Sequence, residues 1–71
     1  MRASKLQHYI EGSKKIAAGI LRDTALGNIK EIEYDYALLE RLKLTASEDL
    51  SPDHLASYHV FLKTLHTNVV V

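Results

Sequence analysis

The residues best suited to metal chemistry in this chain are three histidines near its carboxyl end. His59 and His66 are seven residues apart, which separates them by roughly 10 Å along a helix axis. Zinc lies about 2 Å from a ligand nitrogen, so this pair cannot share one ion without a further element between them. His54 and His59 are five apart and would point to different sides of a helix. With no cysteine in the chain, we expect no bound metal and interpret His59 and His66 as residues that flank an apolar seam.

Acid–base catalysis would need two carboxyl groups with different environments in a cleft that excludes water. The acidic residues of the middle segment do not form such a pair. Glu33 and Glu40 would share one side of a helix, whereas Glu31 and Asp35 would lie on another. We interpret this set as a solvated helix face. Because the chain also has no nucleophile turn or phosphate loop, we expect no enzyme activity, no cofactor and no small-molecule substrate.

The middle segment has more apolar surface than a single contact would cover. On a helix, Tyr34, Leu38 and Leu42 form a row at four-residue spacing, and a second ridge lies roughly opposite. Tyrosine is favoured at interfaces because it combines a large apolar area with a polar tip. We predict that this row binds a partner, with Tyr36 and Arg41 as rim contacts. The alternative is that the row packs against the third helix of the same chain, and both interpretations are open at this point.

Size and composition favour a partner as well. A chain of 71 residues is one domain, spanning residues 1–71, and such a chain buries only about 60% of its unfolded surface. Small proteins usually add disulfides, a metal or a second subunit, and the absence of cysteine excludes disulfides.

The absence of cysteine also fits a reducing compartment, so we expect a cytoplasmic protein. The initial Met1 suggests a complete small protein, and no apolar run approaches the roughly 20 residues that span a membrane.

The charges of the chain balance, with nine basic and nine acidic residues. Residues 1–27 carry five basic and two acidic residues, whereas residues 28–50 carry three basic and six acidic residues, which favours packing of the first helix beside the second. A basic first helix is the feature that a nucleic-acid-binding module would use. Zero net charge makes that function less favoured, because phosphate neutralisation dominates such binding. Its phosphate contacts would be Lys5, Lys14, Lys15 and Arg22.

Three helices account for the chain. The first is expected at about residues 4–25, because Ser4 and Gln7 form a capping box and Gly27 suits a left-handed terminus. Gly12 and Ser13 leave its continuity open, because a helix could break there. Gly12 and Gly19 lie seven residues apart on one side of the helix, where they would either allow another helix to approach closely or produce a kink. Its apolar stripe contains Leu6, Tyr9, Ile10, Ile16, Ala17, Ile20 and Leu21.

The second helix is expected at about residues 28–44, with Asn28 as its N-cap, and Thr45–Leu50 is predicted to be a loop. The third is expected at about residues 52–68, because Ser51 and Pro52 form a strong start signal. Its apolar seam contains Leu55, Tyr58, Leu62, Leu65 and Val69, with Phe61 beside them.

These patterns predict an all-α fold, a three-helix bundle built on an antiparallel helical hairpin. We expect a small non-enzymatic regulatory or adaptor protein that binds another protein or a second copy of itself. The predicted partner-binding residues are Tyr34, Tyr36, Leu38, Arg41 and Leu42. The alternative is the small nucleic-acid-binding module described above.

Overall fold

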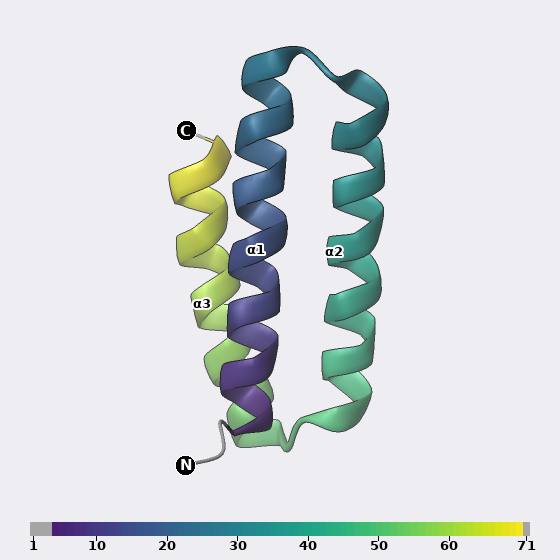
Figure 1. The fold of residues 1–71 in the computed structure, drawn as a ribbon. Helices are drawn as coiled ribbons and strands as arrows, with labels where there is room; N and C mark the ends of the chain where they lie inside the picture. The colour runs from purple at the N-terminus through teal and green to yellow at the C-terminus, as the bar shows by residue number, and fades with distance from the viewer. Residues whose placement is uncertain (1–3, 71) are drawn as a thin grey trace.

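The chain forms three helices, which confirms the predicted all-α bundle. The computed structural model describes the backbone of residues 4–70 and the side chains of residues 4–65. Helix α1 spans Lys5–Leu26, α2 spans Ile29–Asp49 and α3 spans Pro52–Val70. Helices α1 and α2 are an antiparallel hairpin, and α3 returns alongside α1 (Figure 1). The predicted seam residue Val69 and the flanking His66 lie outside the described side chains.

Two of the three predicted helix starts are capped by a side chain. The Ser4 hydroxyl accepts a hydrogen bond from the Gln7 N–H at 3.1 Å. The Ser51 hydroxyl lies 3.4 Å from the His54 N–H at the start of α3. Asn28 precedes α2 as expected, but its side chain makes no capping hydrogen bond. The two serine hydroxyls accept hydrogen bonds from backbone N–H groups that have no partner within the helix.

Helix α1 is continuous through Gly12 and Ser13 and ends at Gly27. Gly27 has φ +71°, a conformation that glycine adopts without the steric cost of a Cβ. Both helical glycines face α2. A Cβ on Gly12 would lie 3.2 Å from Leu42 Cδ2, and one on Gly19 would lie 3.4 Å from Asp35 Oδ2. The glycines therefore allow close approach of α2 and do not break the helix.

The prediction of a loop at Thr45–Leu50 was wrong. Helix α2 continues to Asp49, five residues beyond the expected end at Leu44. The reason is packing: Ala46 is fully buried and Leu50 is 8% exposed, at a four-residue spacing that places both on one side of a helix. The sequence of this segment is polar, but burial of these two residues stabilises the helical conformation.

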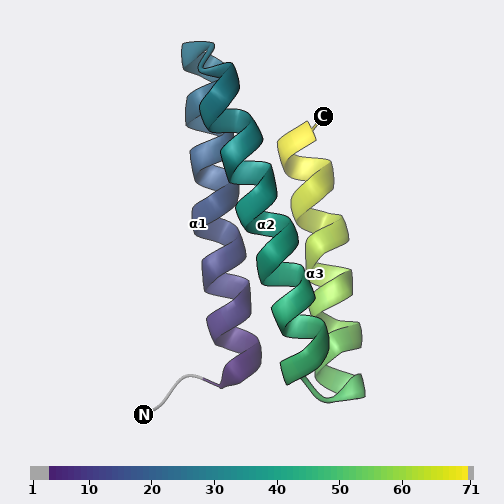
Figure 2. The same cartoon turned by 90° about the vertical axis from the view of Figure 1, so that its right-hand side faces the viewer.

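Helix α1, and not α2, is the central helix of the bundle. Extensive contacts join α1 to α2 and α1 to α3, whereas α2 and α3 make few contacts with each other. In Figure 1 α1 lies between α2 and α3 in projection, and in Figure 2 α2 lies in front, with α1 and α3 to its two sides. Helix α2 meets α3 only near its carboxyl end, where Ala46 lies in one core cluster with Tyr58 of α3.

The hydrophobic core lies at the end of the bundle where α2 connects to α3. Its buried members are Tyr9, Ala46, Leu50 and Tyr58. In the middle of this region, Ser13 and Tyr58 are fully buried and hydrogen-bond through their hydroxyl groups at 2.7 Å. Half-buried residues that pack against the core are Leu6, Ile10, Leu42, Leu55, Phe61 and Leu62. This core cluster joins all three helices at one end of the bundle. The α1–α2 turn lies at the other end.

Candidate protein-binding surface

The predicted row on α2 runs from solvent into the core. Tyr34 is 60% exposed, Leu38 is half-buried, and Leu42 is half-buried and packs against the core. Leu42 lies against Gly12 of α1. Leu42 therefore contributes to folding, whereas the exposed end of the row at Tyr34 is not covered by the described part of α3.

The two predicted rim residues lie on different sides of α2. Arg41 is exposed and follows Tyr34 by seven residues, so it lies on the same side of the helix. Tyr36 is 43% exposed, but two residues at 100° each place it roughly opposite Tyr34. The structure therefore brings together Tyr34, Leu38 and Arg41, which we call the outer row, and separates them from Tyr36.

A shallow groove lies beside the outer row, between α1 and α2. It has a volume of ≈ 490 Å³ and exposes Lys15 and Arg22 from α1 near Leu38 and Asp35 from α2. Ile16, Ala18 and Gly19 complete its lining. The groove combines apolar side chains with two cations, and it continues the surface of the outer row towards α1.

Exposed apolar residues gather at the turn end of the hairpin. Five of the seven large apolar residues that are exposed in the described part of the chain lie between residues 21 and 36. Single exposed apolar residues are common on protein surfaces, whereas a concentration of them is typical of interaction sites. These five residues are Leu21, Leu26, Ile29, Tyr34 and Tyr36.

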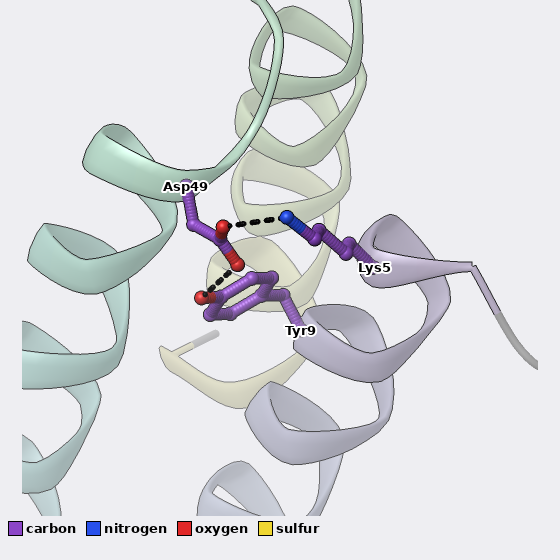
Figure 3. A network of polar contacts seen from close by, with 3 residues as sticks. All are labelled: Lys5, Tyr9 and Asp49. Atoms are coloured by element: carbon purple, nitrogen blue, oxygen red, sulfur yellow. Dashed lines mark hydrogen bonds and ion pairs between the residues drawn. The ribbon is translucent and has the colours of Figure 1, made fainter.

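A polar network holds the opposite end of the hairpin closed. Asp49 at the end of α2 accepts hydrogen bonds from Lys5 Nζ and the Tyr9 hydroxyl of α1, each at 2.9 Å (Figure 3). The hydrogen bond from Lys5, followed by the one from Tyr9, lowers the pKa of Asp49 below its usual value. Burial, followed by the bond to Asp49, raises the pKa of Tyr9. This network was not predicted from the sequence, because Asp49 was expected to lie in a loop.

Asp35 does not lie on a solvated face, which corrects the interpretation of the acidic residues. It is half-buried, and its Oδ2 atom is buried with no donor that would hydrogen-bond to it. Asp23 of α1 is 4% exposed and is near enough to accept a hydrogen bond from a protonated Asp35. This hydrogen bond, which only the protonated Asp35 can donate, then burial and the charge of Asp23, raise the pKa of Asp35, and Arg22 opposes this shift. The small residue Gly19, which lies against Asp35, is the sequence signal for this close approach.

Three of the four basic residues proposed as phosphate contacts have an acidic neighbour. Lys5 pairs with Asp49, Lys14 lies 3.8 Å from Glu11, and Arg22 lies 3.6 Å from Asp23. These pairs reduce the positive field that a nucleic acid would meet on α1. Within residues 4–65, no three His, Asp or Glu side chains converge in a way that would hold a metal ion.

No helix in the described part of the chain is both long enough and apolar enough to cross a membrane. No protein-family model matches the chain, and neither a curated protein nor a solved structure matches it.

Proposed function

We propose that this chain is a small non-enzymatic regulatory or adaptor protein of the cytoplasm that acts by binding protein. Its partner is a second copy of the chain, and the two copies associate through the outer row of Tyr34, Leu38 and Arg41.

The exposure of Tyr34 on a helix with one extensive neighbour is the observation that carries this proposal. Tyr34 is 60% exposed, and α2 packs extensively against α1 alone. Rigid aromatic side chains that are accessible in the monomer are typical anchors of protein interfaces. Arg41 on the same side supplies the second residue type that is enriched in such anchors.

A second copy is the favoured partner because the single chain has a small core. Among residues 4–65, only six apolar residues are buried, and two of these are alanines. Association would add apolar burial to a fold that contains neither a disulfide nor, in its described part, a metal cluster. A standard interface covers about 800 Å² on each partner, a modest fraction of the 5378 Å² surface of this chain.

Charge also favours association of two copies. The net charge of the chain is zero, so two copies have no long-range repulsion. The first segment is basic and the middle segment acidic. A copy that places its α1 against the partner's α2 would therefore pair opposite charges at the rim of the contact.

The test compares Tyr34→Ala with Tyr36→Ala, a control of the same residue type on the opposite side of the same helix. We expect Tyr34→Ala to weaken dimerisation by roughly tenfold or more and Tyr36→Ala to change it little. Leu38→Ala should weaken association more than it lowers helix content. Sedimentation equilibrium gives the dimerisation constant, and circular dichroism gives the helix content. Equal effects of the two tyrosine variants would reject the outer row as the interface.

Nucleic-acid binding by α1 is the competing function, and salt distinguishes it. Phosphate contacts would make binding weaken steeply between low and moderate salt concentration, whereas association through an apolar row would respond little. Tight, steeply salt-dependent binding of a DNA or RNA duplex that is lost in Lys14→Ala/Lys15→Ala would contradict the proposed function.

A further inference from the structure

The carboxyl groups of Asp23 and Asp35 lie within hydrogen-bonding reach of each other between α1 and α2, at the turn end of the hairpin. Asp23 of α1 is 4% exposed, and Asp35 of α2 has one oxygen, Oδ2, that is buried. The two residues lie on helices that approach closely here, because a Cβ on Gly19 would already lie 3.4 Å from Asp35 Oδ2. This contact is separate from the core and from the network around Asp49.

Two ionised carboxylates would make an unfavourable contact. Each carboxylate can only accept hydrogen bonds, so the buried Oδ2 of Asp35 has no donor as long as both groups are ionised. Like charges in a partly buried site also repel. A single proton on Asp35 removes both problems, because Asp35 then donates a hydrogen bond to the Asp23 carboxylate.

We propose that a proton held between Asp23 and Asp35 fastens the turn end of the α1–α2 hairpin, and that loss of this proton loosens it. The device is independent of the proposed dimer. It lies beside the groove that contains Asp35 and Leu38, so loosening changes the helix spacing next to the outer row.

The charged groups around the pair come from α1 and α2. Arg22 on α1 favours ionisation of Asp35, whereas Glu31 on α2 disfavours it. Arg22 is itself 3.6 Å from Asp23, and Lys15 lines the same groove. No charged side chain of the described part of α3 acts on Asp35. The balance of these groups still raises the pKa of Asp35 above its ordinary value of 3.8.

The sign of the pH dependence follows from this direction. A carboxyl group whose pKa is higher in the folded state contributes stability that is fully present below its unfolded value. That stability is lost as the pH rises through the raised folded value. Asp49, whose pKa is lowered, behaves in the opposite way. The two ends of the hairpin therefore respond to pH in opposite directions, with the turn end tighter in acid.

The first test is a titration of the wild-type chain by carboxyl carbon-13 NMR. We expect the Asp35 resonance to titrate above 3.8, together with a perturbation of the Asp23 resonance at the same pH. Amide hydrogen exchange, corrected for intrinsic rates, should show less protection of residues 20–35 at about pH 7 than at about pH 4. A titration of Asp35 at or below 3.8 would overturn the proposal.

The second test uses Asp35→Asn, whose amide mimics the protonated carboxyl group, against Glu33→Gln. Glu33 is an exposed carboxylate two residues away on the same helix, so its variant controls for the change in net charge. We expect Asp35→Asn to melt at a higher temperature than wild type at about pH 7 and at the same temperature at about pH 4. Parallel melting profiles for wild type and Asp35→Asn, or equal gains in both variants, would overturn the proposal.

Discussion

The hydroxyl groups of Ser13 and Tyr58 lie 2.7 Å apart and hydrogen-bond across the α1–α3 contact. Both residues are fully buried, so neither hydroxyl can exchange its partner for water. A buried hydroxyl that loses its partner keeps the whole cost of its desolvation. This pair therefore fixes the position at which α3 packs along α1.

Ser13→Ala should lower the free energy of unfolding by about 1–3 kcal/mol, because it leaves the Tyr58 hydroxyl buried without a partner. The double variant Ser13→Ala/Tyr58→Phe should recover part of this loss, since it removes both polar groups. Urea denaturation of the set at one protein concentration measures these differences. Ser47→Ala, at an exposed position, is the control and should change stability by about 0.5 kcal/mol or less. If the double variant is less stable than Ser13→Ala by as much as Tyr58→Phe is less stable than wild type, the two residues are not coupled.

Asp49→Asn should remove an acid-sensitive contribution to stability. The folded-state pKa of Asp49 is lowered from 3.8, first by Lys5 and then by Tyr9, so its contribution is present above that unfolded value. The contribution is lost as the pH falls through the lowered folded value. Wild type should therefore be more stable than Asp49→Asn near pH 7, with a difference that shrinks below about pH 4.

Thermal melts over this pH range measure the difference between wild type and Asp49→Asn. Glu48→Gln is the matched control, because Glu48 is an exposed neighbour on the same turn of α2. If the difference between wild type and Asp49→Asn stays constant with pH, the hydrogen bonds of Asp49 do not stabilise the ionised form.

Leu42→Ala should destabilise the fold, whereas Leu44→Ala should not. Leu42 packs against the core and against Gly12, and its truncation removes apolar contacts and leaves a space, at a cost of about 2 kcal/mol. Leu44 is the same residue type on the same helix and is 65% exposed, so its variant should stay within about 0.5 kcal/mol of wild type. Urea midpoints at matched concentration test the pair. Similar losses in both variants would mean that Leu42 does not belong to the core.

Local sequence signals predicted the helices well because they act within a few residues. Ser4 caps α1, Ser51 lies at the start of α3, and Gly27 ends α1 in the left-handed conformation. The end of α2 was less predictable, because Ala46 and Leu50 are weak local signals whose burial depends on residues far along the chain. Tyr9 and Asp49, for example, are 40 residues apart.

Helical periodicity gives the side of a helix on which a residue lies, but not the element that covers that side. The two ridges of α2 indicated more apolar surface than one contact would cover, yet α1 is the helix that packs extensively against both others. The same limit applies to the outer row. Periodicity grouped Tyr34 with Leu42, and only the structure separates exposed Tyr34 from Leu42 at the core.

The solution mass of the purified chain, measured by sedimentation equilibrium over a concentration series, tests the proposed dimer most directly. We predict a mass that rises from that of one 8.0 kDa chain to twice that value, with a midpoint that moves to higher concentration in Tyr34→Ala. A mass of one chain at every concentration would contradict self-association through the outer row.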